Sequence, residues 1–206
     1  MAGKFIVLEG VDQVVLEAQA NHLVAWLQEQ QFPVIITREP TAGPVGGQVQ
    51  LALDGRLILD TRTLAVLSVA DRMDHLQREE GGILRHLAEG RHVICVGYAL
   101  ADYAHLSDAH LSDAHFSDAN ISDANISDAV SLEWLIRINQ LCVWPDLVIV
   151  VDVKTTADDD MRNRYLYAVE QCCLDGKNIV VVDGNQADDG LRRACQDLVK
   201  QFVLGE

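Results

Sequence analysis

The chain has 206 residues, of which 49% are hydrophobic and 23% are charged, so we expect residues 1–206 to form one folded domain. Sixteen Lys and Arg against 31 Asp and Glu give a net charge of −15. This balance argues against a DNA-binding or membrane-binding protein, because both classes depend on surplus Lys and Arg. The chain has no apolar run long enough to span a membrane and no signal-peptide layout at its start, which predicts a cytoplasmic protein.

Short apolar runs rich in Val and Ile alternate with helical patterns along the chain. The predicted strands are residues 4–9, 34–37, 92–96, 147–151 and 178–182. Apolar residues at helical spacing predict helices near 16–27, 61–78, 82–89 and 191–202. This alternation favours an α/β fold with a five-stranded parallel sheet and helices on both faces. Ligands of such folds bind at the carboxyl ends of the strands, so the residues that follow the first three strands are the candidates for a site.

Five segments of the chain form a recognisable series. They are 5–12 (FIVLEGVD), 37–40 (TREP), 70–72 (ADR), 92–95 (HVIC) and 144–153 (WPDLVIVVDV). In order and spacing this series resembles the thymidylate kinase family, over roughly residues 4–100 and 131–203. The resemblance implies the P-loop fold of a nucleoside monophosphate kinase, which transfers phosphate from ATP to dTMP with Mg²⁺.

The segment after the first strand departs from the pattern that this chemistry requires. A phosphate loop reads G-x-x-x-x-G-K-[ST]: its backbone N–H groups surround phosphate, its Lys neutralises charge and its hydroxyl binds Mg²⁺. Here Gly10 and Asp12 are followed by Val15 in place of the second Gly, Leu16 in place of the Lys and Glu17 in place of the hydroxyl residue. We therefore expect a degenerate loop, no catalytic residues, and neither ATP nor Mg²⁺ as a cofactor.

A helix start can bind phosphate through its free N–H groups. That helix start should still exist here, so Gly, Lys and Thr at positions 15, 16 and 17 should restore phosphate binding. We expect no fast turnover from such a variant, because Val96 and Gly97 stand where the family carries an Asp-Arg pair that holds the acceptor phosphate.

Two further contact positions of the family are altered. Ser68 stands where an aromatic residue would stack on thymine, and Ser cannot stack. The family's arginine-bearing lid would fall between residues 152 and 165, where this chain has a short acidic segment that includes Arg162 and Arg164. We interpret these two arginines as solvated surface residues in preference to remnants of a lid.

Five residues still match positions that contact nucleotide in the family: Asp12, Arg38, Glu39, Arg72 and Tyr98. The resemblance places Asp12 near the sugar, Arg38 near the acceptor phosphate and Arg72 on the thymine edge. The alternative is structural, with Asp12 capping the next helix and the arginines paired with leftover carboxylates. We favour the structural alternative, because the strands keep the character of the family while its contact residues are replaced.

Residues 104–128 consist of five pentads of the form Ala-[His/Asn]-[Leu/Phe/Ile]-Ser-Asp. A period of five fits neither an amphipathic helix nor an alternating strand. It resembles pentapeptide-repeat proteins, whose four-sided β-helix turns the central apolar residue inward. Five pentads make little more than one coil, and a solenoid unit needs neighbours to bury its apolar side. The coil could pack on the body, stack on a partner or remain an acidic loop. The candidate interaction residues are Leu106, Leu111, Phe116, Ile121 and Ile126.

Histidines and cysteines in the chain do not predict a metal site. His105, His110 and His115 recur with the pentads, but successive pentads of a four-sided coil face different sides. The five cysteines are odd in number and lack C-x-x-C spacing, so we interpret all five as core residues in a reducing compartment.

Three functions from different classes remain open. The favoured one is a catalytically inactive thymidylate-kinase-like protein that acts as a binding or assembly subunit, with a protein partner or a second copy as in a homodimer. The second is an active dTMP kinase that converts ATP and dTMP to ADP and dTDP with Mg²⁺. The third is a module that senses a dTMP-like nucleotide without turnover. None of the three involves DNA or a membrane.

Overall fold

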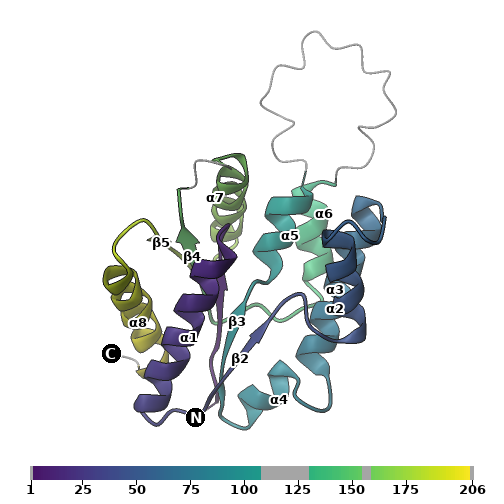
Figure 1. Cartoon of the computed structure of the whole chain (residues 1–206). Coiled ribbons are helices and arrows are strands. Elements are labelled where there is room, and N and C mark those ends of the chain that lie inside the picture. Colours follow the sequence, from purple (N-terminus) through teal and green to yellow (C-terminus); the bar gives the residue numbers. More distant parts are fainter. Residues whose placement is uncertain (1, 108–129, 155–158, 205–206) are drawn as a thin grey trace.

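Five parallel strands form a single sheet in the order β2-β3-β1-β4-β5, in a computed structural model that describes residues 2–107, 130–154 and 159–204 (Figure 1). The strands are β1 (Phe5–Glu9), β2 (Val34–Arg38), β3 (His92–Val96), β4 (Leu147–Asp152) and β5 (Ile179–Asp183). Every residue of β1 and β3 is buried, because helices cover the sheet on both faces. The predicted strands are confirmed, with ends that differ by one residue.

Helices on both faces join the strands. Those in the described part of the chain are α1 (Gln13–Glu29), α2 (Pro44–Leu53), α3 (Thr61–Gln77), α4 (Ile83–Ala88), α5 (Ala99–Leu106), α6 (Leu132–Asn139), α7 (Asp159–Leu174) and α8 (Asp188–Leu204). Helices α1 and α8 cover one face of the sheet, and α3, α5, α6 and α7 cover the other (Figure 1). The sequence pattern predicted α1, α3, α4 and α8, the family resemblance placed a helix near Tyr165 that is α7, and α2, α5 and α6 were missed. The arrangement confirms the α/β, P-loop-kinase-like fold class.

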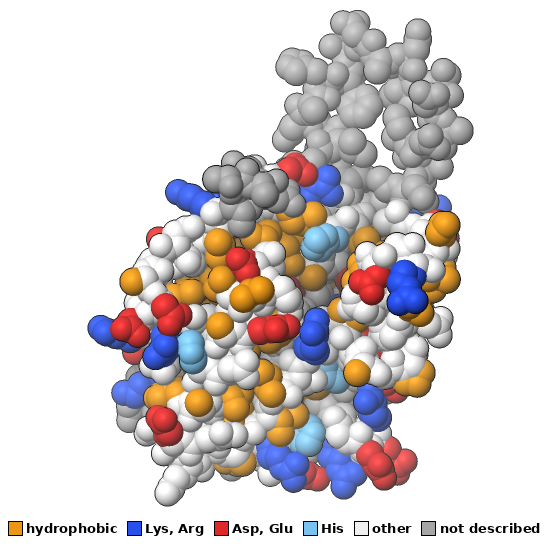
Figure 2. Space-filling model, viewed as in Figure 1, with side chains coloured by type: hydrophobic (Ala, Val, Ile, Leu, Met, Phe, Trp, Pro, Cys, Tyr) orange, Lys and Arg blue, Asp and Glu red, His pale blue; other side chains and the backbone are white. Residues whose placement is uncertain are grey.

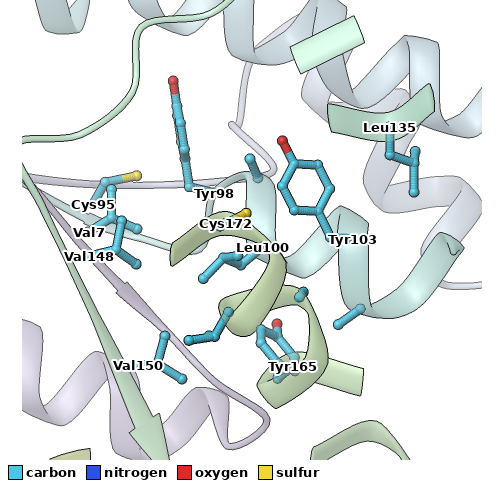
Figure 3. Packing of buried hydrophobic residues seen from close by; sticks show 14 of the residues in the cluster. Val7, Cys95, Tyr98, Leu100, Tyr103, Leu135, Val148, Val150, Tyr165 and Cys172 are labelled. Carbon is cyan, nitrogen blue, oxygen red and sulfur yellow. The ribbon is translucent and has the colours of Figure 1, made fainter. Parts of the chain in front are cut away.

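The core is divided in two by the sheet, because successive side chains of a strand point to opposite faces. Ile6 and Leu8 face α1 and α8, whereas Phe5 and Val7 face the other layer. The second layer carries much of the aromatic packing of the core, as Figure 3 shows. Its labelled residues are Val7, Cys95, Tyr98, Leu100, Tyr103, Leu135, Val148, Val150, Tyr165 and Cys172.

The expectation that all five cysteines are core residues is wrong for Cys173, which is exposed. It follows the buried Cys172 on α7, and neighbouring residues of a helix point roughly 100° apart, so the two cannot share a face. Cys95 and Cys195 are buried and Cys142 is partly buried, and all five thiols are free. Among the described residues no group of His, Cys, Asp and Glu could hold a metal ion. No described helix is long and apolar enough to cross a membrane.

The first pentad does not begin as a β-helix coil, because residues 104–106 form the last turn of α5. Ala104 is buried in the core and Leu106 packs against it, so their apolar side chains complete the body of the protein. Ser107 then pairs with Val130 in an isolated parallel bridge, which brings the two ends of the insertion together. The remaining pentad candidates fall outside the described residues. They are His110, Leu111, His115, Phe116, Ile121 and Ile126.

Candidate functional site

Helix α1 begins at Gln13, in the stretch where a phosphate loop would run. The Oδ1 atom of Asp12 accepts the N–H groups of Val14 and Val15 at 3.0 and 3.1 Å. The Asp12 carbonyl accepts the N–H of Leu16 at 3.0 Å. The N–H groups of Val14 and Val15 are among those that a helix N-terminus would offer to a phosphate. Asp12 therefore has the capping role, and the first turn of α1 replaces a phosphate-binding loop.

Leu16, which stands at the position of the family's lysine, is part of the core. Its side chain is 2% exposed and packs with Ile6 and Leu8 of β1. Gly10 is required by the same packing: its φ is 150°, and a Cβ there would lie 2.6 Å from the carbonyl oxygen of Val151. Backbone geometry and packing thus explain the presence of Gly10, the glycine that remains from the loop pattern, without any ligand.

Glu17 and Arg38 face each other across the mouth of the site. Arg38 Nη1 lies 3.4 Å from Glu17 Oε1, and both side chains are about half exposed. Gln13 Nε2 donates to the same Glu17 oxygen at 3.2 Å. The arginine that the resemblance assigned to the acceptor phosphate is therefore paired with a carboxylate of the protein. Restoration of phosphate binding at positions 15–17 stays a prediction, and it has to overcome the Asp12 cap at this helix start and the burial of Leu16.

Behind this pair lies a cavity of about 490 Å³ at the carboxyl ends of β1, β2 and β3, where ligands of parallel α/β folds bind. Four of the five sequence candidates line it, namely Arg38, Glu39, Arg72 and Tyr98; Asp12 does not. Ser68, at the family's stacking position, also lines the cavity. The structure thus brings the acceptor-side candidates together in a cavity whose lining also includes Gln13 and Leu16 of α1.

Arg72 is the centre of a buried polar cluster in the wall of the cavity. Its Nε donates to Glu39 Oε2 at 2.9 Å, and its Nη1 donates to Asp102 Oδ2 at 3.0 Å and to Asn139 Oδ1. Its guanidinium carbon also lies 4.6 Å from the centre of the Tyr98 ring. Burial disfavours the charge on Arg72, but Glu39 and Asp102 outweigh it and raise the pKa of Arg72. The guanidinium is thus used to balance carboxylates of the protein.

The other family-like polar residues around Arg72 also have internal partners. Glu39 Oε1 lies 3.1 Å from His75 Nδ1, and His75 Nε2 lies 2.6 Å from Thr37 Oγ1. Asp71 accepts the N–H of Thr41 at 2.8 Å and its hydroxyl at 2.6 Å. These contacts tie the loop after β2 to α3, which gives the TREP and ADR motifs a structural role.

Two carboxyl groups of the cavity were not predicted from the sequence. Glu9 is 1% exposed and accepts the N–H of Leu100 at 3.1 Å, which anchors the start of α5. Burial raises the pKa of Glu9 to about 8, against the opposing effect of Arg72. Burial likewise raises the pKa of Asp102, again against Arg72. The position of Glu9, an acidic residue at the end of an apolar strand, was a signal in the sequence for a site residue. Asp102 lies on α5, a helix that the sequence pattern missed.

We expect Glu9→Gln to flatten the pH dependence of stability. The folded state keeps a proton on Glu9 that the unfolded chain releases between pH 4.5 and about 8, so the free energy of unfolding falls as the pH rises through this window. One such proton contributes at most about 1.4 kcal/mol per pH unit. Gln keeps an acceptor for Leu100 N–H but does not titrate, so the variant should be the more stable protein near pH 8.

Urea unfolding across this pH range measures the effect, with the exposed Glu29→Gln on α1 as the control. The control should show the same pH dependence of the free energy of unfolding as the wild type. Parallel stability curves for wild type and Glu9→Gln would contradict the raised pKa of Glu9.

Of the two arginines near the former lid, Arg162 is not a solvated surface residue, whereas Arg164 forms a surface pair within α7. Arg162 forms a two-pronged ion pair with Asp152, with distances of 2.5 and 2.6 Å, and its side chain is mostly buried. Arg164 donates to Asp160 at 3.0 Å. The reason is local: α7 begins at Asp159 and directs Arg162 back onto the end of β4. Residues 155–158 lie outside the described part of the chain.

Surface charge does not suggest a nucleic-acid interface on the face that Figure 2 shows. Lys and Arg side chains are scattered there and lie among Asp and Glu side chains. Many of the arginines of the described residues pair with a carboxylate four residues away along the chain, such as Arg78 with Asp74 and Arg137 with Glu133. A phosphate backbone would require a continuous basic stripe.

A model of the thymidylate kinase family matches residues 8–119, which is more than half of the chain. The chain belongs to the thymidylate kinase family. A probable thymidylate kinase of Pyrococcus abyssi is 32% identical over 158 residues, which cover 74% of this chain and 66% of the relative, just under two thirds of its length. A probable thymidylate kinase of Thermococcus gammatolerans is 29% identical over 98% of both chains. A thymidylate kinase of Nitrosomonas eutropha is 28% identical over 97% of this chain and 94% of its own.

Proposed function

We propose that this member of the thymidylate kinase family is catalytically inactive and acts as a binding or assembly subunit. The observation that carries the proposal is the start of α1, where Asp12 accepts the N–H groups that a phosphate loop would offer and Leu16 lies in the core. No ATP, Mg²⁺ or other cofactor belongs to this function. Five free cysteines support a cytoplasmic location.

The acceptor side supports the same conclusion. Val96 is a buried residue of β3, and Gly97, which has a φ of 77°, has no side chain to hold a phosphate. Arg38 is paired with Glu17 and Arg72 with Glu39 and Asp102. Loss of one group that stabilises transition-state charge costs on the order of 10²–10³ in rate. Several such groups are replaced here together, so turnover at a useful rate is not expected.

The assembly role is supported by the place and sequence of the insertion. The described residues that flank it, Ser107 and Val130, form a bridge, so the ends of α5 and α6 to which it connects lie side by side (Figure 1). Loops tolerate insertions at modest closure cost. Residues 108–129 contain five Asp and no Lys or Arg, which favours a partner protein with a basic face; stacking of pentads from a second copy is the alternative.

Replacement of residues 108–129 by a short Gly/Ser linker tests this role. The first pentad is kept through Ser107, because Ala104 and Leu106 complete the body. We expect the melting temperature to stay nearly unchanged while the assembly, measured by light scattering and by pull-down from the native source, is lost. The cause is loss of the apolar and acidic contact surface.

A second variant tests the apolar contribution apart from the acidic one. It changes Leu111, Phe116, Ile121 and Ile126 to Ser while all Asp residues remain. It should also lose assembly. An unchanged assembly in both variants would contradict the role proposed for the insertion. A collapsed melting temperature would instead make the segment part of the core.

A further inference from the structure

We propose that the cavity at the ends of β1, β2 and β3 binds a small organic cation, a primary ammonium group on an apolar or aromatic body, in place of a nucleotide. The proposal rests on the loss of phosphoryl transfer, since an active kinase would need this cavity for its acceptor. It concerns the ligand of the cavity and is independent of the partner that the pentads contact.

The charges that line the cavity favour a cation. Carboxyl groups of Glu9, Glu39 and Asp102 surround a single buried guanidinium, that of Arg72. The second arginine of the lining, Arg38, is at the mouth and faces Glu17. A phosphate would bring further negative charge to a wall that already has more carboxyl groups than guanidinium groups. A bound ammonium would supply the missing positive charge.

Glu9 is the carboxyl group of the lining whose ionisation a cation would change. Glu9 lines the cavity at 1% exposure, and burial raises its pKa to about 8 although Arg72 is nearby. A cation in the cavity would favour ionised Glu9, so binding would release a proton near neutral pH. The titratable or charged groups that face Glu9 come from several elements: Arg72 of α3, Asp102 of α5, Glu39 after β2, Tyr98 after β3, Cys95 of β3, and Tyr165 and Cys172 of α7.

The remaining walls of the cavity suit an apolar or aromatic body. Tyr98 and Tyr165 contribute rings, and Leu64 and Ala101 contribute aliphatic surface. Ammonium groups are attracted to aromatic faces as well as to carboxylates. A volume of about 490 Å³ lies in the range of small-molecule sites in proteins, roughly 300–1,000 Å³. Ser68 leaves open the space that a larger side chain would fill.

Calorimetry with three probes tests the proposal on the full chain: phenethylamine, its uncharged isostere 2-phenylethanol, and dTMP. We expect phenethylamine to bind at least about tenfold more tightly than the alcohol, a difference of about 1.4 kcal/mol. Its affinity should rise about tenfold between about pH 6 and about pH 8.5, because Glu9 ionises in this window while a primary ammonium stays charged. No binding of dTMP is expected.

Glu9→Gln should abolish the rise in affinity with pH, and Glu29→Gln should retain it. Equal affinities for phenethylamine and the alcohol, or no binding of either, would overturn the cation proposal and leave the proposed function intact. Saturable binding of dTMP that excludes phenethylamine would also overturn it. Conversion of dTMP to dTDP on addition of ATP would overturn the proposed function as well, so the two failures are distinguishable.

Discussion

Leu16→Lys should lower the free energy of unfolding by about 3–5 kcal/mol and should not create an ATP site. Truncation of a buried Leu already costs about 2–5 kcal/mol, and an ammonium among apolar side chains adds a desolvation cost. Leu16 is 2% exposed between β1 and α1, in contact with the cluster that contains Ile6, Leu8 and Ile149. We therefore expect the lysine that phosphate transfer requires at this position to destabilise the core of this chain.

Val14→Lys provides the matched control, because Val14 lies in the same helical turn and is 78% exposed. Its effect should stay within about 0.5 kcal/mol, as for ordinary surface substitutions. Urea unfolding of the two variants and the wild type gives the comparison. A Leu16→Lys variant that is as stable as Val14→Lys and binds ATP would show that the start of α1 can open into a phosphate loop.

Arg72→Met should lower the free energy of unfolding by about 3–5 kcal/mol near neutral pH, because it leaves Glu39 and Asp102 buried without their cation. Methionine retains much of the side-chain volume over the Tyr98 ring, so most of the loss should come from charge. The loss should shrink at acidic pH, where the two carboxyl groups take up protons and no longer need a partner.

The control for this variant is Arg78→Met, at the carboxyl end of the same helix. Arg78 pairs with Asp74 on the surface, and such pairs contribute about 0–1 kcal/mol. Urea unfolding at neutral and acidic pH compares the two. Equal losses for Arg72→Met and Arg78→Met would mean that the buried cluster does not hold the fold, and that Arg72 is available to a ligand.

The strands could be predicted because a strand buried on both faces is a continuous apolar run, as in Phe5–Glu9 and Leu147–Asp152. The helices α2, α5 and α6 have only eight to ten residues, too few to show a clear period. Helix α5 was also hidden because its last residues belong to the first pentad. The repeat pattern suggested a β-helix coil from Ala104 onward. Packing of Ala104 against the core favoured a further helical turn of α5 instead.

The site was less predictable than the fold. The replacements at positions 15, 16 and 17 are visible in the sequence. The capped start of α1 also depends on the packing of Leu16 against one face of the sheet, which the sequence does not show. The partners of Arg72 are 30, 33 and 67 residues away along the chain, so their convergence arises only in the tertiary structure. The family motifs identified Arg72 and Glu39 as site residues. Only the three-dimensional structure showed that Asp102, Asn139 and Glu9 lie near them.

Phosphoryl transfer from ATP to dTMP, measured with Mg²⁺ and with the protein in excess over labelled ATP, tests the central claim most directly. The thymidylate kinase of Nitrosomonas eutropha serves as the positive control. Because Asp12 occupies the helix start and Leu16 replaces the lysine, we expect no dTDP above the amount formed without protein. Formation of dTDP at a rate comparable with that of the positive control would contradict the account.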